Sequence, residues 1–164
     1  MPKTALIVDD STSLRQMVAF TMKEAGFDVI EGENGQEALD KSDGKNFDLV
    51  ITDLNMPVMD GLTLLANLNE KYPLLKSVIV SAYGDMANIR AALNRGAFDF
   101  VTKPIDFSDL EATIAKTIRH VEGVRDARRR QAEAEQIIHN DPLVQALMAQ
   151  YKTARIVPGS IKPH

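Results

Sequence analysis

Short apolar segments alternate with longer amphipathic segments up to residue 121, and this alternation restricts the fold more than any other feature. The apolar segments are too short for buried helices and are bounded by polar residues, as is typical of strands buried on both faces. They are residues 4–8, 29–30, 49–52, 78–81 and 98–102. Between them, apolar residues recur at helical spacing over segments of crossover length. The chain therefore predicts an α/β fold, a doubly wound five-stranded parallel sheet with five helices on its two faces.

Local signals mark the ends of the expected helices. Ser11 or Ser13 can cap the first helix, and Gly26 can end it. At the last helix of the domain, Ser108 is followed three residues later by Glu111, which is the spacing of a capping box. We therefore expect this helix to begin near Ser108.

The composition changes near residue 122. A chain of 164 residues suffices for one domain and an appendage, so we predict a domain at 1–122 and a helical extension at 123–164. Segment 123–140 can continue the last helix, and Pro142 indicates the first turn of another. The heptads of the extension are poor, which leaves open a dimeric signalling helix or a solvated helix with paired charges.

Composition excludes several classes of protein. No segment approaches the apolar length of a membrane span, and the N-terminus lacks the apolar core of a signal peptide, so we expect a cytoplasmic protein without membrane contact. The chain has no cysteine, so any metal must be held by oxygen or imidazole ligands. The net charge is −4, and acids neighbour the arginines of 125–130, so no direct nucleic-acid binding is expected.

Polar side chains lie at or just after the ends of four of the five expected strands. Because the carboxyl ends of parallel strands lie at one edge of a sheet, we expect these side chains to meet there. They are Asp9, Asp10, Asp53, Ser81 and Lys103.

This set of residues is suited to phosphoryl transfer. Three neighbouring carboxylates repel one another unless a cation lies among them, and Mg²⁺ is the cation that carboxylates, carbonyls and water hold best. A lysine and a hydroxyl can both contact a phosphoryl group. Asp53, at the end of the apolar segment 49–52, is the carboxylate that we expect to act as nucleophile and form an acyl phosphate.

The sequence also resembles a known family, the receiver domains of two-component response regulators, over about residues 4–121. The resemblance implies the flavodoxin-like strand order 2-1-3-4-5. The residues that carry it are Asp9-Asp10, Asp53 with Asn55, Pro57 and Gly61, Ser81-Ala82, and Lys103-Pro104.

The resemblance implies a role for each acid. Asp53 would be phosphorylated by a sensor histidine kinase or a phosphotransfer protein. Asp10, Asp53 and the backbone carbonyl of Asn55 would bind Mg²⁺, and Asp9 would reach the ion mainly through water.

The resemblance also implies a switch. Ser81 and Lys103 would contact the phosphoryl group, with a cis bond between Lys103 and Pro104. Phe100, in place of the more familiar tyrosine, would move inward as the Ser81 hydroxyl turns toward the phosphoryl group, and this would change the surface of the fourth helix, fifth strand and fifth helix. Tyr83 lies where the family modulates dephosphorylation.

We therefore expect a phosphoacceptor switch that catalyses only its own phosphorylation and dephosphorylation, and that self-associates through the fourth to fifth helix face or the C-terminal helix. One alternative is the N-terminal receiver of a longer effector, such as a transcriptional activator or signalling enzyme; no phosphate-binding glycine loop follows within these residues. Another is a Mg²⁺-dependent phosphohydrolase, although that class usually has an acid where this chain has Asn55. The sequence does not identify the kinase, the signal or the target.

Overall fold

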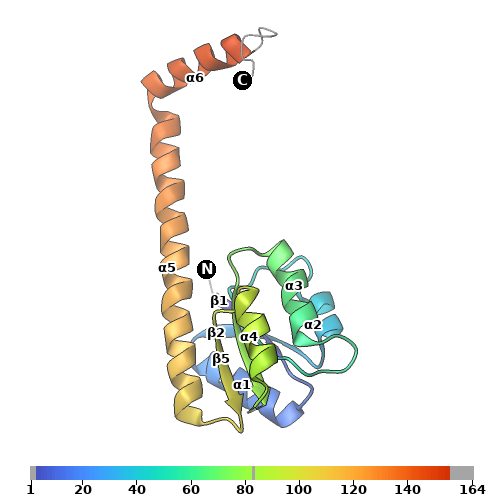
Figure 1. Ribbon diagram of the computed structural model, residues 1–164. Coiled ribbons are helices and arrows are strands. Elements are labelled where there is room, and N and C mark those ends of the chain that lie inside the picture. Colours follow the sequence, from blue (N-terminus) through green and yellow to red (C-terminus); the bar gives the residue numbers. More distant parts are fainter. Residues whose placement is uncertain (1–2, 83, 156–164) are drawn as a thin grey trace. The chain divides into compact units, whose positions relative to one another are not determined.

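Five parallel strands form a single sheet in the computed structural model, which describes residues 3–82 and 84–155 (Figure 1). The strand order is β2-β1-β3-β4-β5, and each neighbouring pair is parallel. The predicted sheet and its order are therefore confirmed. The strands are β1 Lys3–Val8, β2 Phe27–Gly32, β3 Leu49–Asp53, β4 Lys76–Ala82 and β5 Asp99–Lys103.

Helices follow each strand and cover both faces of the sheet, and the side chains of the central strand alternate between two cores. On β3, Val50 packs into the core shared with α2, α3 and α4, which includes Leu64. Leu49 and Ile51 pack into the opposite core, shared with α1 and α5, which includes Met22. The helices are α1 Thr12–Glu24, α2 Gly35–Ser42, α3 Gly61–Lys71, α4 Met86–Asn94, α5 Phe107–Asn140 and α6 Pro142–Arg155.

The helix caps agree with the sequence at α1 but not at α5. The Ser11 hydroxyl accepts a hydrogen bond from the Leu14 N–H, as expected of a capping residue. At α5 the expected cap at Ser108 is wrong, because the helix begins at Phe107. The carboxylate of Asp106 instead accepts from the backbone N–H groups of Ser108 and Asp109, at 2.8 and 3.2 Å. A charged acceptor just before the helix serves these N–H groups, and this places Ser108 inside the first turn.

The chain divides into two units, Met1–Glu122 and Gly123–His164, and the division falls within α5. The first unit contains the sheet, α1 to α4 and the beginning of α5. In the second unit the rest of α5 is a continuous helix and α6 starts at Pro142, so both helical predictions are confirmed. Among residues 3–82 and 84–155, no helix combines the length and apolar character that a membrane span needs.

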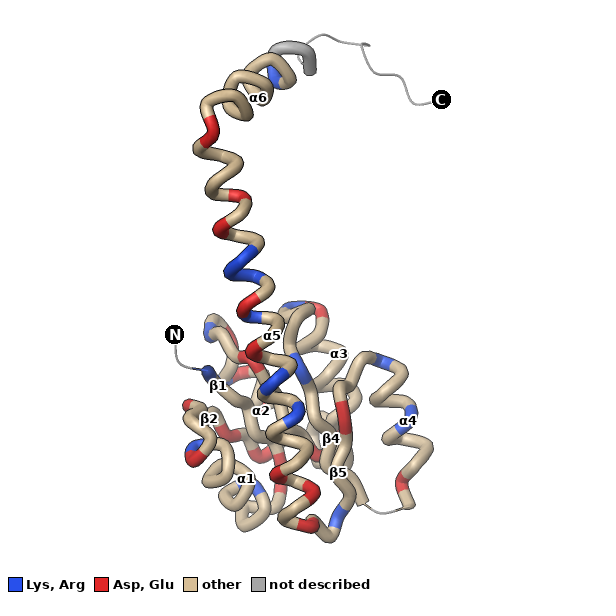
Figure 2. The backbone as a smooth tube through the Cα atoms, turned by 90° about the vertical axis from the view of Figure 1, so that its left-hand side faces the viewer, with Lys and Arg blue, Asp and Glu red and all other residues tan. Residues whose placement is uncertain are grey.

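The second unit exposes charged and apolar side chains alike. Basic and acidic residues are interspersed along α5 after Gly123 (Figure 2), and Arg129 forms an ion pair of 3.4 Å with Asp126 one turn earlier. This pair agrees with the solvated-helix interpretation. Among the residues of this unit whose burial is described, 123–152, the exposed large apolar ones are Ile137, Ile138, Leu143, Leu147, Met148 and Tyr151.

Candidate functional site

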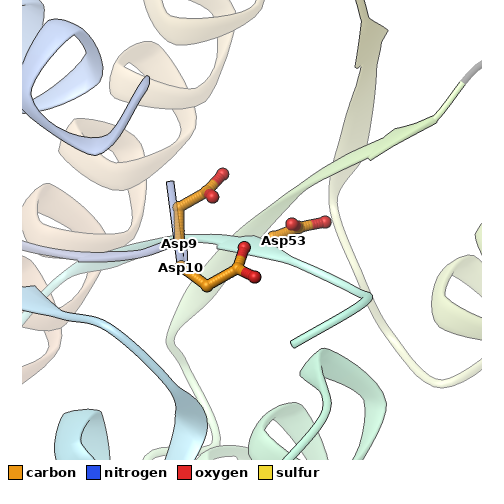
Figure 3. A group of neighbouring side chains, drawn as sticks. All are labelled: Asp9, Asp10 and Asp53. Atoms are coloured by element: carbon orange, nitrogen blue, oxygen red, sulfur yellow. The ribbon is translucent and has the colours of Figure 1, made fainter. Parts of the chain in front are cut away.

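Three carboxylates meet at the carboxyl edge of the sheet, as the sequence predicted (Figure 3). Asp53 is the last residue of β3, and Asp9 follows β1, which pairs with β3 in parallel. Asp10 comes from the same β1–α1 loop. One oxygen from each of the three lies within 4.8 Å of the others. Asp9 and Asp53 are only 4% and 5% exposed, whereas Asp10 is exposed to solvent.

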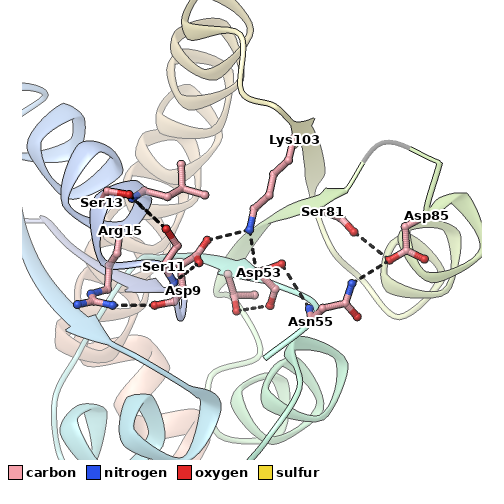
Figure 4. A network of polar contacts seen from close by, with 11 residues as sticks. Asp9, Ser11, Ser13, Arg15, Asp53, Asn55, Ser81, Asp85 and Lys103 are labelled. Carbon is pink, nitrogen blue, oxygen red and sulfur yellow. Dashed lines mark hydrogen bonds and ion pairs between the residues drawn. The ribbon is translucent and has the colours of Figure 1, made fainter. Parts of the chain in front are cut away.

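Lys103 reaches this cluster from the end of β5. Its Nζ donates a hydrogen bond to Asp53 Oδ2 at 2.9 Å and lies 3.4 Å from Asp9 Oδ2 (Figure 4). Burial works to lower the pKa of Lys103, but its hydrogen bond to Asp53 and the charges of Asp53 and Asp9 outweigh burial and raise that pKa. Lys103 is therefore a permanent cation beside Asp53.

The ionised carboxylate of Asp9 remains poorly stabilised, although Lys103 lies nearby. Burial raises the pKa of Asp9, and the negative charge of Asp53 adds to this effect. A hydrogen bond from the Ser11 N–H at 2.8 Å and the charge of Lys103 oppose the rise without cancelling it. One lysine thus leaves the three carboxylates with an excess of negative charge.

The donor set fits a hard divalent cation. All three ligands are carboxylate oxygens, which Mg²⁺ and similar ions prefer, and the chain has no cysteine that could supply a thiolate ligand. The excess negative charge around Asp9 and the exposure of Asp10 to water both favour an ion that keeps part of its hydration shell. The cluster can therefore hold a metal ion.

Arg15, a residue that the sequence analysis missed, fixes the backbone of the acid loop. Its guanidinium Nη1 donates to the Asp9 carbonyl oxygen at 2.8 Å. Its Nε lies 3.3 Å from a Glu31 carboxylate oxygen, and its Nη2 lies 3.9 Å from one of Glu33. Arg15 is 8% exposed. The sequence does contain a signal for Arg15: it is an arginine three residues before Val18, on the apolar face of the expected first helix.

Ser81 is buried at the end of β4, but its hydroxyl turns away from the acid cluster (Figure 4). Ser81 Oγ donates to Asp85 Oδ2 at 3.1 Å. Asn55 lies beside Asp53, and its backbone N–H donates to Asp53 Oδ1 at 3.3 Å. Its side-chain amide donates to the same oxygen of Asp85 at 3.4 Å. Asp85, a residue not singled out from the sequence, therefore holds both.

The remaining expected features lie around β5. Phe100 is partly buried and packs against the core that β3 shares with α2, α3 and α4. The bond between Lys103 and Pro104 is cis, as the resemblance implied. Tyr83 lies outside the described residues.

The end of the β3–α3 loop, at Gly61, packs against the backbone of Asp53 and Leu54 so closely that no side chain fits there. The Gly61 N–H donates to the Leu54 carbonyl at 2.9 Å. A Cβ atom on Gly61 would overlap the carbonyl oxygen of Asp53 and lie 2.8 Å from the Cα of Leu54. Gly61 therefore allows α3 to start directly behind the backbone of Asp53.

Comparison with known proteins identifies the family. Residues 5–115 match the model of the response regulator receiver domain. The chain belongs to this family. The family and the fold that the sequence predicted are thereby confirmed, and the protein is a receiver of two-component signal transduction.

The curated relatives of this receiver are longer proteins. The DNA-binding transcriptional regulator NtrC of Klebsiella pneumoniae is 35% identical over 116 residues, which cover 71% of this chain and 25% of NtrC. The transcriptional regulatory protein GlrR of Escherichia coli K12 is 33% identical over 159 residues, which cover 97% of this chain and 34% of GlrR. The matched regions are thus a quarter to a third of these relatives.

Solved structures agree with the receiver fold. A CheY-like receiver domain protein from Methanospirillum hungatei JF-1 has a TM-score of 0.69 at 28% identity, over 75% of this chain and 98% of that one. NtrX from Brucella abortus has a TM-score of 0.71 at 26% identity, over 78% of this chain and 30% of NtrX.

The raised pKa of Asp9 predicts that Asp9→Asn stabilises the receiver without divalent metal. The folded protein binds the Asp9 proton more tightly than the unfolded chain does, so the ionised carboxylate costs free energy of folding at neutral pH. This cost disappears as the pH falls through the raised pKa and Asp9 becomes protonated. We expect Asp9→Asn to melt above the unsubstituted protein at neutral pH, with a difference in melting temperature that narrows on acidification.

Thermal unfolding in a chelator at a series of pH values measures this difference. Asp10→Asn is the matched control, because Asp10 is exposed and its carboxylate is already hydrated. A lower melting temperature for Asp9→Asn at neutral pH, or a gain equal at all pH values, would contradict the prediction.

Proposed function

We propose that this receiver accepts a phosphoryl group on Asp53 from a sensor histidine kinase or phosphotransfer protein, in a Mg²⁺-dependent reaction. The observation that carries the proposal is the position of Asp53, whose carboxylate accepts a hydrogen bond from Lys103 Nζ at 2.9 Å and has an oxygen within 4.8 Å of oxygens of Asp9 and Asp10. A carboxylate held beside a cation and a metal site is an activated nucleophile for phosphoryl transfer.

Each residue has a distinct task in this reaction. A carboxylate oxygen of Asp53 forms a bond to phosphorus as the bond from phosphorus to the donor's leaving group breaks, and the leaving group keeps that electron pair. Asp10, Asp53 and the backbone carbonyl of Asn55 would hold Mg²⁺, and Asp9 would reach the ion mainly through water; the ion would neutralise charge on the phosphoryl oxygens. Lys103 contacts another phosphoryl oxygen.

The response to phosphorylation involves Ser81 and Phe100. The Ser81 hydroxyl contacts the phosphoryl group, and Phe100 moves inward and changes the surface formed by α4, β5 and α5. The partial burial of Phe100 against the core supports this role, because the residue still exposes area to solvent that an inward movement would bury.

The output is expected to depend on a larger assembly. We assign residues 1–122 to the receiver domain and 123–164 to a helical extension that joins it to an effector or mediates self-association. The match to GlrR, which spans nearly all of this chain but a third of GlrR, supports the interpretation of an N-terminal receiver in a longer effector. Self-association would use the α4–α5 face or the extension.

Incubation with acetyl phosphate and Mg²⁺ tests the proposed function and separates a switch from a phosphohydrolase. The proposal predicts one lasting phosphoryl group per chain, seen as a single mass increase that a chelator prevents. Rapid release of phosphate over many turnovers, without accumulation of phosphoprotein, would identify a phosphohydrolase instead. No modification under these conditions would contradict both.

Lys103→Ala is expected to separate phosphorylation from its consequences. Asp53 keeps its metal site in this variant, so slow labelling by acetyl phosphate should persist. The phosphoryl group then lacks the Lys103 ammonium that ties it to β5, which carries Phe100. Amide chemical shifts of β5 and the start of α5, with and without beryllofluoride, report this coupling, and we expect the shift changes to be largely lost.

Lys41→Ala is the matched control, since Lys41 pairs on the protein surface with Glu37 at 2.9 Å. It should respond like the unsubstituted protein. Full beryllofluoride-induced shifts in Lys103→Ala would count against the role of Lys103.

A further inference from the structure

Asp85 connects three elements through one carboxylate. It is the residue before α4, and its Oδ2 accepts hydrogen bonds from Ser81 Oγ at 3.1 Å and from Asn55 Nδ2 at 3.4 Å. Figure 4 shows the bonds from Ser81 and Asn55. The other oxygen of Asp85, Oδ1, accepts from Asn88 Nδ2 at 2.9 Å. The carboxylate thereby joins the end of β4 and the loop after β3 to the first turn of α4.

Asp85 also occupies the capping position of α4 without capping it. At α1, α2 and α3, the side chains of Ser11, Asn34 and Asp60 each accept a backbone N–H from the first turn of their helix. Asp85 makes no such hydrogen bond, and its backbone angles, φ −84° and ψ 45°, are not the extended ones of those three caps. The bonds to Ser81 and Asn55 therefore divert a side chain that is chemically suited to cap the helix.

The Ser81 hydroxyl has one proton and can donate it to one acceptor at a time. In this structure the acceptor is Asp85. In the phosphorylated receiver, the Ser81 hydroxyl would donate a hydrogen bond to a phosphoryl oxygen on Asp53. That hydrogen bond would need the same proton. Asp85 and the phosphoryl group are consequently competitors for Ser81.

We propose that Asp85 is a positioning residue that latches Ser81 and Asn55 in the unphosphorylated receiver. This inference rests on the proposed function of Asp53. Phosphorylation transfers the Ser81 hydrogen bond from Asp85 to the phosphoryl group, and the released carboxylate becomes available to the first-turn N–H groups of α4. The hydrogen bonds of Asp85 thus stabilise the unphosphorylated state and oppose activation. Their rearrangement couples the phosphoryl group to the start of α4.

A double-mutant cycle on beryllofluoride affinity tests the latch. The dissociation constant is measured by calorimetry at saturating Mg²⁺ for the unsubstituted protein, Asp85→Ala, Ser81→Ala and the double variant. We expect Asp85→Ala to bind about 5- to 10-fold more tightly, the size expected when a typical competing hydrogen bond is removed. In the Ser81→Ala background, the same substitution should change affinity less than about twofold, because the shared hydroxyl is absent.

Two further measurements separate a hydrogen bond from charge. Asp85→Asn keeps an oxygen that can accept from Ser81, so its affinity should stay near that of the unsubstituted protein. Hydrogen exchange reports on α4 directly: beryllofluoride should slow exchange of the first-turn amides in the unsubstituted protein and leave them unchanged in Asp85→Ala. Melting temperatures establish that each variant is folded.

The outcomes distinguish the latch from the function on which it rests. Failure of the unsubstituted protein to bind beryllofluoride would overturn the proposed function and the latch together. Normal binding by the unsubstituted protein with equal or weaker binding by Asp85→Ala would overturn the latch alone. Two further results would also overturn the latch, since the charge of Asp85 would then explain the effect. One is an equal gain in beryllofluoride affinity from Asp85→Ala with Ser81 present and with Ser81→Ala. The other is an equal gain from Asp85→Asn and from Asp85→Ala.

Discussion

Asp53→Asn is expected to abolish phosphorylation of this receiver. The substitution replaces the nucleophilic carboxylate with an amide of nearly the same volume, which cannot form a stable acyl phosphate at neutral pH. The amide oxygen can still accept the hydrogen bond that Lys103 Nζ donates at 2.9 Å, so the fold should persist. Intact mass after incubation with acetyl phosphate and Mg²⁺ should show no phosphoprotein above background.

Asp60→Asn is a matched control for this experiment. Asp60 is exposed and caps α3 by accepting from the Thr63 N–H, and asparagine caps helices equally well. Its labelling should equal that of the unsubstituted protein. Stoichiometric labelling of Asp53→Asn would place the acceptor elsewhere, with Asp9 and Asp10 the first to be examined.

Gly61→Ala is expected to produce the largest loss of stability among single-methyl additions near the site. The added Cβ would overlap the carbonyl oxygen of Asp53 and lie 2.8 Å from Leu54 Cα, and both are backbone atoms that cannot rotate away. Relief requires movement of the start of α3 or the end of β3, which we expect to lower the free energy of unfolding by about 3 kcal/mol. The same movement displaces the Asp53 carboxylate and should weaken Mg²⁺ binding.

Gly123→Ala is the contrasting variant, because Gly123 is inside α5 and a Cβ atom there would meet no atom within 4 Å apart from the adjoining helix backbone. Alanine favours a helix interior over glycine, so this variant should be stabilised by up to about 1 kcal/mol. Urea unfolding measures both changes. Unchanged stability and Mg²⁺ affinity in Gly61→Ala would show that the loop behind Asp53 is less tightly packed than described.

The sheet could be predicted from sequence because its strands are short and buried on both faces. Leu49, Val50 and Ile51 leave no polar face, and such strands need helices on either side. The order of the strands came from the family resemblance instead, since alternation alone permits more than one order. The positions of Asp9, Asp53 and Lys103 followed from the shared edge of parallel strands.

Side-chain partners could not be predicted in the same way. Asn55 and Asp85 are 30 residues apart, and nothing in their local sequence indicates that they contact each other. Arg15 is a similar case, because its partner is the backbone carbonyl of Asp9 rather than a residue type that a motif would specify. At α5 the pattern from Ser108 to Glu111 was present, but Asp106 lay two residues earlier with a stronger acceptor.

A crystal structure with Mn²⁺ and beryllofluoride would show whether the metal and the phosphoryl mimic meet at Asp53, because anomalous scattering locates the metal independently of the protein. We expect Mn²⁺ bound by Asp10 and Asp53, beryllofluoride on an Asp53 oxygen, and contacts from Lys103 and Ser81 to its fluorine atoms. Metal bound away from these carboxylates, or beryllofluoride on another residue, would contradict this expectation.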